Sequence, residues 1–283
     1  MGNVHVEPGI YPGVDFDTYS SWDAANHSTL VHFSKTPAHA QYAALHQEEK
    51  VATNLGHLVH QVILEPERLK EDYLVAPKVD RRTKAGKAEW AKFEAAANGR
   101  IIVSEDDMGT ARALLFNAQN HAVLREMLGG PGINELSMVW LDPEFNIPCK
   151  GRIDRVTEYM KQAYVVDLKT HGFAATRHSF EKSIHQYGYH QQAAWYLRGL
   201  EVLMPLPDGA PERRFAWAVC ETKEPNLVRV FDADDEALRL GLDEILGYLA
   251  QYKACREAGV WPGWGDGMEI AGLPGWAMKR FEG

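Results

Sequence analysis

The sequence lacks the features of membrane, secreted and disulfide-stabilised proteins. No window in its 283 residues approaches the ~18 uncharged apolar residues of a membrane span. The N-terminus has no basic region followed by an apolar stretch, so it does not resemble a signal peptide. The three cysteines, Cys149, Cys220 and Cys255, are widely spaced and match neither a disulfide framework nor a zinc site. We therefore expect a cytoplasmic protein with reduced thiols and no membrane partner.

An excess of basic residues is also missing. The chain carries 30 Lys and Arg residues against 39 Asp and Glu residues, which gives a formal net charge of −9. Because nucleic-acid-binding surfaces are usually basic, this balance argues against a generic nucleic-acid binder. The hydrophobic share of 45% excludes a disordered chain and is sufficient for a large core.

Hydrophobic periodicity predicts an α/β (α+β) fold with a helical N-terminal elaboration. The first fifty residues are expected to form a loop and short helices. Longer helices are expected at 53–64, from the N-cap Ser104 to Gly129-Gly130, at 177–199 and at 233–258. Strands are expected at 133–142, 147–158, 163–169, 213–222 and 227–232. No change in composition divides the chain, so we expect a single domain over residues 1–283.

Two predicted strands end in a dense group of polar residues. Gly151-Arg152-Ile153-Asp154 ends one strand, and Asp167-Leu168-Lys169 ends the next. Side chains alternate along a strand, so Asp167 and Lys169 share a face while Leu168 points into the core. If Asp154 lies alongside, two carboxylates and an ammonium converge, which suits Mg²⁺ and an activated water. The alternative is a solvated ion pair that does no chemistry.

Residues elsewhere in the chain are spaced so that they can join this group. Glu135 stands at the start of the first predicted strand, toward the same end of the sheet. Gly56 and His60 are four residues apart on one predicted helix, and Gln192 and Tyr196 are four apart on another. Each of these pairs therefore shares a helix face. Taken alone, His60 is more typical of a structural helix histidine.

In chain order these motifs resemble the PD-(D/E)XK nuclease superfamily, particularly its RecB-like and phage-type exonucleases of the exodeoxyribonuclease VIII type. The motifs are Gly56-x-x-x-His60, Glu135, Gly151-x-x-Asp154, Asp167-x-Lys169 and Gln192-x-x-x-Tyr196. The resemblance spans about residues 9–280. It implies a restriction-endonuclease-like core at 131–258, with a central mixed sheet flanked by helices. It further implies a mainly helical part at 1–130 that forms a wall of a DNA channel, followed by a C-terminal tail at 259–283.

The resemblance also implies a metal site. His60, Asp154, Asp167 and the backbone carbonyl of Leu168 would be its ligands. The expected ion is Mg²⁺, with Mn²⁺ able to substitute.

Four residues would act at the bond that is cut. The resemblance implies that Lys169 positions or activates the attacking water and that Glu135 assists at the metal. Gln192 and Tyr196 would hold the metal shell, the lysine or the phosphate.

The implied activity is metal-dependent 5′→3′ degradation of linear double-stranded DNA, which leaves 3′ single-stranded tails for recombination. The implied partners are DNA ends, further copies of the chain in a ring-like trimer or tetramer, and a single-strand annealing recombinase. The setting would be a bacterial cell, with a phage or prophage origin. Three alternatives stay open: an endonuclease, a single-strand-specific nuclease and a non-catalytic module that binds DNA ends.

A basic stretch from Lys78 to Lys92 stands out in the otherwise acidic chain. Given the resemblance, we expect Arg81, Arg82, Lys84 and Lys87 to contact DNA phosphates. The alternative is a solvated helix face. This stretch would line the entrance of the DNA channel, so the net charge alone would mislead about the partner.

The C-terminal tail contains Trp261, Trp264 and Trp276. These residues are expected to anchor the tail by packing, and stacking on bases is the alternative.

Overall fold

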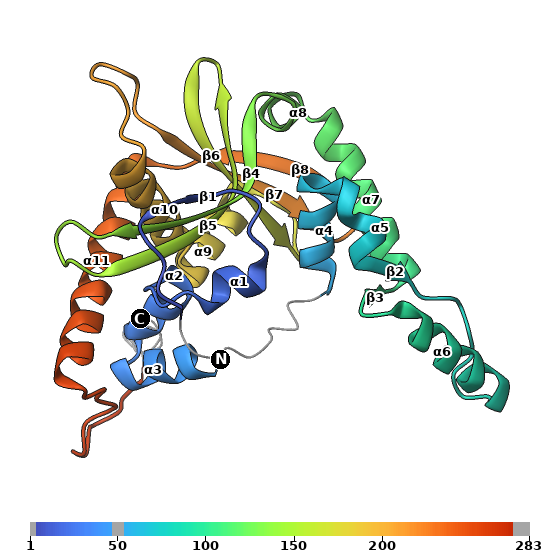
Figure 1. Ribbon diagram of the computed structural model, residues 1–283, viewed down its shortest axis with the longest axis horizontal. Helices are drawn as coiled ribbons and strands as arrows, with labels where there is room; N and C mark the ends of the chain where they lie inside the picture. Colours follow the sequence, from blue (N-terminus) through green and yellow to red (C-terminus); the bar gives the residue numbers. More distant parts are fainter. Residues whose placement is uncertain (1–3, 47–53, 274–283) are drawn as a thin grey trace, which may run out of the picture.

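The centre of the computed structural model, which describes residues 4–46 and 54–273, is a six-stranded sheet (Figure 1). Its strands, in spatial order, are β1 (Gly9–Tyr11), β4 (Gly132–Leu141), β5 (Pro148–Tyr159), β6 (Gln162–His171), β7 (Arg214–Glu221) and β8 (Val228–Asp232). Strands β6 and β7 are parallel, and every other neighbouring pair is antiparallel. The predicted mixed sheet is therefore confirmed.

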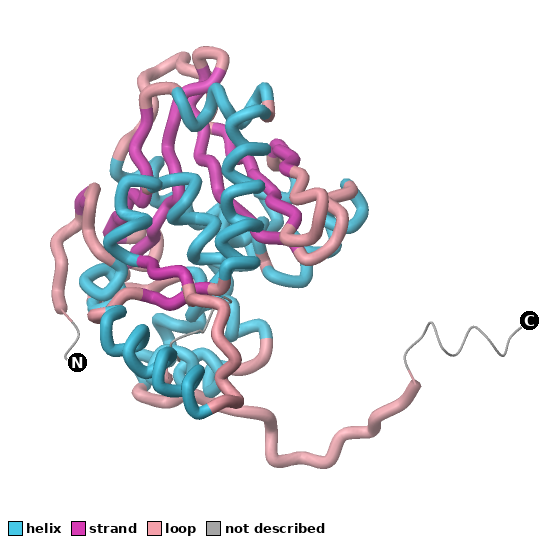
Figure 2. Tube along the Cα trace, turned by 90° about the vertical axis from the view of Figure 1, so that its right-hand side faces the viewer, coloured by secondary structure: helices cyan, strands magenta, loops and turns pink. Residues whose placement is uncertain are grey.

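Helices cover both faces of this sheet (Figures 1 and 2). The N-terminal half contains α1 (Phe16–Ser21), α2 (His27–Leu30), the 3-10 helix η1 (Val31–Ser34), α3 (Pro37–Leu45), α4 (Asn54–Leu64), the 3-10 helix η2 (Pro66–Arg68), α5 (Leu69–Asp72), α6 (Lys84–Ala97), α7 (Glu105–Asn120) and α8 (Ala122–Gly129). The C-terminal half adds α9 (Arg177–Tyr187), α10 (Tyr189–Leu203) and α11 (Asp235–Ala258). A small parallel sheet of β2 (Tyr73–Val75) and β3 (Ile101–Val103) lies beside α5 and α6.

The alternation of side chains along the strands builds one core on each face of the sheet. On β6, Val165 packs into the core that contains residues of α9, α10 and α11. Its neighbours Val166 and Leu168 pack into the other core, with α4, α7 and α8. The two faces therefore bring α4 and α10 against opposite sides of the same strands.

Two predicted long helices are each interrupted. The helix expected from Ser104 to Gly129 ends at Asn120, because the ring of His121 accepts a hydrogen bond from the backbone N–H of Leu124 and starts α8. The helix expected at 177–199 breaks at Gly188, whose φ of +66° is left-handed. The short strands β1, β2 and β3 were not predicted, because three residues are too few for a periodic pattern.

The N-terminal segment is tied to β5 by a buried lysine. The Lys150 Nζ atom donates hydrogen bonds to the carbonyls of Tyr19, Ser20 and Trp22, over 3.0, 2.9 and 2.8 Å. Burial lowers the pKa of Lys150 to about 8. These carbonyls lie at the C-terminal end of α1, where a cation is favourable, so the contact fixes α1 beside the sheet.

The tail after α11 begins against the body of the molecule and then leaves it (Figure 2). Trp261 packs on Phe33 and Tyr252, at ring-centroid distances of 6.1 and 5.9 Å, as expected of an anchor. Trp264 is 71% exposed, and Trp276 lies outside the described residues. Among the helices of the described ranges, none is long and apolar enough to cross a membrane.

Candidate metal-dependent active site

Three carboxylates form a row across β4, β5 and β6. The β4–β5 ladder pairs Asn134 with Arg155 and Leu136 with Ile153, which places Glu135 opposite Asp154. The β5–β6 ladder ends at the pair Arg155–Val166, so Asp154 and Asp167 are the next residues along. Both strands continue past this row, to Tyr159 and His171. The expectation that Asp154 and Asp167 stand at strand ends was therefore wrong.

The β5–β6 ladder opens at Asp154, and the carboxylate of this residue takes over its hydrogen bonding. Asp154 Oδ2 accepts a hydrogen bond of 2.7 Å from the backbone N–H of Leu168. A side chain thus replaces the backbone carbonyl that would normally satisfy this amide. This hydrogen bond fixes the Asp154 side chain against the backbone of Leu168. The carbonyl oxygen of Leu168 in turn contacts His60 on α4.

Glu135 reaches the row through an unusual backbone conformation. Its φ of +49° is left-handed, which is uncommon for a residue with a long side chain and typical of functional sites. The Arg152 guanidinium holds the Glu135 carboxylate, with 2.7 Å between Nε and Oε2. Arg152 also donates hydrogen bonds to the carbonyl of Val14 and to the Ser137 hydroxyl. These contacts orient Glu135 from the N-terminal segment and from β4.

His60 approaches the row from α4, the helix that also contains Gly56. Its Nε2 atom lies 3.0 Å from the Leu168 carbonyl oxygen, and its Nδ1 atom lies 3.6 Å from Asp154 Oδ2. Two neighbouring ligands of an octahedral Mg²⁺ at 2.0–2.1 Å are themselves about 3 Å apart. The spacing of His60 Nε2 and the Leu168 oxygen therefore suits a shared cation as well as a direct hydrogen bond.

A chain of polar contacts runs from Asp167 on β6 to α10. The Lys169 Nζ atom lies 2.7 Å from Asp167 Oδ2 and donates a 2.7 Å hydrogen bond to Gln192 Oε1. The Gln192 side-chain amide donates in turn to the Tyr196 hydroxyl, at 3.1 Å. A Cβ atom at Gly151 would stand 3.1 Å from the Tyr196 ring, so glycine lets this ring lie against β5. Gln192 and Tyr196 do share a helix face.

The electrostatics of the row favour a bound cation. Burial raises the pKa of Asp154 to about 7; nearby Asp167 and Glu135 add to this shift and His60 opposes it. Burial alone would lower the pKa of Lys169, but the Asp167 and Asp154 carboxylates outweigh burial and raise it. Lys169 is therefore an ammonium at neutral pH, and together with the Arg152 guanidinium it places two positive charges against the three carboxylates of the row.

The donor atoms fit a divalent cation. One ligand atom each from His60, Glu135 and Asp154 lies within 4.8 Å of the other two. Asp167 is not among these three. It is 2% exposed, and its Oδ2 atom has no aligned hydrogen bond from the described residues, although Lys169 is close enough for an ion pair. Carboxylate and carbonyl oxygens with one imidazole are a donor set for a hard cation such as Mg²⁺ or Mn²⁺.

The structure brings together most of the residues that the motifs predicted. They are His60, Glu135, Asp154, Asp167, Leu168, Lys169, Gln192 and Tyr196. The four basic residues expected to contact DNA lie elsewhere, in the turn before α6 and in its first two turns: Arg81, Arg82, Lys84 and Lys87.

Two residues at the site escaped the motif analysis. Arg152 was seen only as part of a glycine-containing motif, although its position two residues before Asp154 places it on the same strand. Tyr189 lies three residues before Gln192 on α10, outside the five motifs. Its ring centroid lies 4.4 Å from the Lys169 Nζ atom, which is a cation–π contact.

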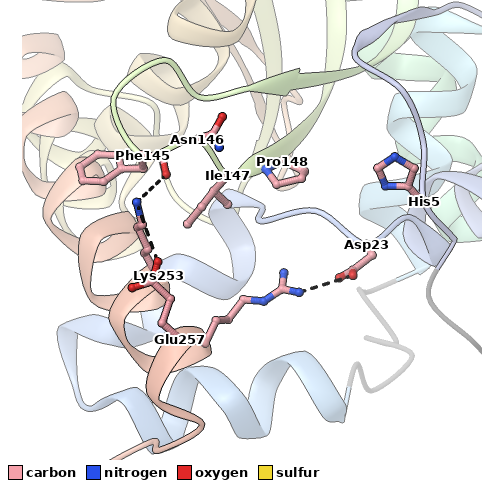
Figure 3. A pocket seen from close by; sticks show the side chains of 9 residues that line it. His5, Asp23, Phe145, Asn146, Ile147, Pro148, Lys253 and Glu257 are labelled. Carbon is pink, nitrogen blue, oxygen red and sulfur yellow. Dashed lines mark hydrogen bonds and ion pairs between the residues drawn. The ribbon is translucent and has the colours of Figure 1, made fainter.

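A cleft of about 430 Å³ lies apart from the row (Figure 3). Its charged groups are engaged with one another or with the backbone. Lys253 donates to the carbonyl of Phe145 at 3.0 Å, and Arg256 lies 3.6 Å from Asp23. The cleft has none of the carboxylate convergence of the row, so we place the candidate active site at the row.

Comparisons with known proteins bear on the family and the fold. Residues 26–272 match the family described as "PDDEXK-like domain of unknown function (DUF3799)". A crystal structure of a "Putative exonuclease" from Eubacterium rectale superposes with a TM-score of 0.55 at 12% identity, over 94% of this chain and 95% of that one. At this identity the likeness shows the fold alone. No curated protein matches the chain at a significant level.

Two further solved structures have TM-scores too low to bear on the fold. SSO0001 has a TM-score of 0.26 at 13% identity, over 69% of this chain and 87% of that one. VC1899 from Vibrio cholerae has a TM-score of 0.25 at 12% identity, over 88% of this chain and 59% of that one.

The raised pKa of Asp154 predicts a pH-dependent stability. The carboxyl titrates near 7 in the folded metal-free protein and near ~3.9 in the unfolded chain, so between these values the folded state alone keeps the proton. The stability contributed by Asp154 therefore falls as the pH rises through this window. We expect Asp154→Asn to raise the Tm in EDTA at about pH 8 and to have little effect near about pH 4.

Differential scanning calorimetry at both pH values measures this difference. Each kcal/mol that the substitution adds to the free energy of unfolding should raise the Tm by about 2–4 °C for a chain of this size. Asp208→Asn, at an exposed loop position, is the matched control and should behave as wild type. An Asp154→Asn variant that is less stable than wild type near pH 8 would contradict the raised pKa.

Proposed function

The chain belongs to the PDDEXK-like family that it matches, and from this membership and the geometry of the row we propose that it is a metal-dependent nuclease. The observation that carries the proposal is the convergence of Glu135, Asp154 and Asp167 with the Lys169 ammonium. Buried like charges are costly unless a ligand compensates them. A divalent cation supplies that compensation, and phosphodiester hydrolysis is a reaction that uses it.

His60, Glu135, Asp154 and the Leu168 carbonyl would hold the cation, with Asp167 on the side of Lys169. When bound, the cation supplies positive charge for the phosphate in the transition state and acidifies water. Mg²⁺ is the proposed ion, and Mn²⁺ should replace it because both favour oxygen ligands.

Lys169 acts as a charged hydrogen-bond donor in this proposal. Its raised pKa keeps it protonated, so it can hold the attacking water or a phosphate oxygen by a charge-assisted hydrogen bond. Gln192 accepts one N–H of Lys169 and thereby fixes where the remaining N–H groups point. Tyr196 keeps its proton because burial raises its pKa well above 10, and it fixes the Gln192 amide. Arg152 positions Glu135.

We further propose that the substrate is linear double-stranded DNA, cut from its ends in the 5′→3′ direction to leave 3′ single-stranded tails. This specificity is supported by the motif resemblance described above. The same resemblance supports a ring-like trimer or tetramer, which would enclose DNA, and a single-strand annealing recombinase as partner in phage or prophage recombination.

Replacing Lys169 tests the nuclease proposal. Lys169→Met removes the ammonium while keeping a side chain of similar length, so we expect cleavage to fall by about 100-fold or more. Lys161→Met, at an exposed position in the β5–β6 turn, is the matched control and should cleave as wild type. The measurement is a time course on end-labelled linear duplex with Mg²⁺ or with EDTA, beside closed-circular duplex.

The same time course separates the alternatives. Cleavage of the circular duplex by the wild-type protein would indicate an endonuclease. An end-labelled single strand is run in parallel, and its cleavage without cleavage of either duplex would indicate a single-strand-specific enzyme. Wild-type protein that binds linear DNA without cutting it in Mg²⁺ or Mn²⁺ would leave a DNA-end binding module and overturn the nuclease proposal. Equal rates for Lys169→Met and wild type would overturn the role of Lys169.

We propose that the turn before α6 and the start of α6 form a DNA-binding arm, defined by Arg81, Arg82, Lys84 and Lys87. All four are exposed, and α6 lies at the outer end of the segment that contains α5, β2 and β3 (Figure 1). The turn is well defined: Thr83 caps α6 and Gly86 fits closely against the Asp80 carbonyl. Arg81 lies over the Trp90 ring at 4.1 Å, so part of its guanidinium is already fixed.

Removing the two consecutive arginines, Arg81 and Arg82, tests the DNA-binding arm. We expect the double variant Arg81→Ala, Arg82→Ala to bind linear duplex more weakly. The slope of the logarithm of the binding constant against the logarithm of the salt concentration should become shallower by about 0.9 for each phosphate that the arm no longer neutralises. Fluorescence anisotropy across a salt series in Ca²⁺ measures both effects. Arg239→Ala, which removes an exposed arginine from α11, is the control. An unchanged slope would place the arm outside the DNA interface.

A further inference from the structure

Five aromatic rings form a continuous cluster beside Lys169, and the inference drawn from it rests on the proposed nuclease function. We define the aromatic cluster as Phe173, His171, Phe180, Tyr189 and Tyr187. Ring centroids along this series are 6.0, 6.2, 6.1 and 5.6 Å apart. These spacings lie within the range of favourable aromatic contacts, so the five rings support one another.

The middle of the aromatic cluster is buried, while both of its ends are exposed. Phe180 is 1% exposed and His171 is 7% exposed, whereas Phe173 is 76% exposed and Tyr187 is 57% exposed. Phe180 is also stacked on Phe231, with 4.9 Å between centroids. Because the inner rings are held in the core, the two outer rings are presented to solvent on a rigid base.

The aromatic cluster is tied directly to the candidate active site. Tyr189 lies between Tyr187 and Lys169, with its ring 5.6 Å from the first and 4.4 Å from the Nζ atom of the second. The other exposed end, Phe173, is four residues beyond Lys169, in the loop that follows β6. Tyr187 is therefore linked through Tyr189 to the residue that would face the scissile phosphate, and Phe173 follows that residue along the same strand and its loop.

We propose that Phe173 and Tyr187 stack on unpaired bases of the DNA strand that is held at Lys169. Every base offers a π-face, so such stacking tolerates any sequence, as a nuclease that degrades long DNA requires. In an intact duplex the base faces are covered by their neighbours. Stacking on protein rings therefore selects a strand with a frayed or free end, which links the aromatic cluster to the choice of linear DNA.

The test uses the full-length protein in Ca²⁺ and a linear duplex that carries 2-aminopurine at its 5′-terminal base. Stacking on a ring quenches the fluorescence of this base. Because one base–aromatic contact is worth about 1–3 kcal/mol, we expect Tyr187→Leu and Phe173→Leu each to lower affinity for this duplex about 5-fold or more and to reduce quenching. Tyr187→Trp should keep affinity and quenching near the wild-type level, because it keeps an aromatic ring at this position.

The control is Phe116→Leu, which removes a comparably exposed ring (65%) from α7 on the opposite face of the sheet. It should leave affinity, quenching and cleavage unchanged. Tyr187→Leu and Phe173→Leu variants that bind this duplex and quench its fluorescence as wild type does would overturn the stacking role. Variants whose oligomeric state changes while their quenching stays at the wild-type level would overturn it as well. Failure of the nuclease proposal would appear separately, as wild-type protein that does not cleave in Mg²⁺.

Discussion

The structure depends on placing Asp154 and Asp167 side by side in a largely dry site. Burial removes hydration from the Asp154 carboxylate, and the nearby Asp167 carboxylate repels it; the rise in the pKa of Asp154 to about 7 reflects these costs, burial being the larger. The sheet creates the arrangement where the β5–β6 ladder stops at Arg155–Val166. Because the ladder opens there, the Asp154 carboxylate can accept a hydrogen bond from the Leu168 amide, and it lies in one row with the carboxylates of Glu135 and Asp167.

The compensating groups come from both faces of the sheet. On one face α4 supplies His60, and on the other α10 supplies Gln192 and Tyr196, which hold Lys169 against Asp167. The two separate cores are thus the means by which one row of carboxylates is reached from opposite sides. Lys169 pairs with Asp167 and Arg152 pairs with Glu135, so a divalent cation beside Asp154 would complete the charge balance of the row, which is why the site is suited to metal-dependent chemistry.

Period-two alternation was sufficient to predict the five longer strands and the shared face of Asp167 and Lys169. Motif spacing was sufficient to predict the pairs on α4 and α10. The break at Gly188 has a local cause, a left-handed glycine at a helix end, that hydrophobic periodicity does not report, and the left-handed backbone of Glu135 has no periodic signal either. The pairing of Arg152 with Glu135 was hidden because the two residues are distant in sequence. Net charge could locate neither the carboxylate row nor the basic residues near α6, because it averages the two groups.

The central claim is that the carboxylate row holds a divalent cation. Anomalous scattering from crystals of the protein grown with Mn²⁺ tests it most directly, because Mn²⁺ is located without reference to activity. We predict a peak within coordinating distance, about 2–2.5 Å, of an Asp154 oxygen and of at least one oxygen from Glu135 or Asp167. Saturating Mn²⁺ with no peak at this row, or with peaks only at other acidic surfaces, would contradict it.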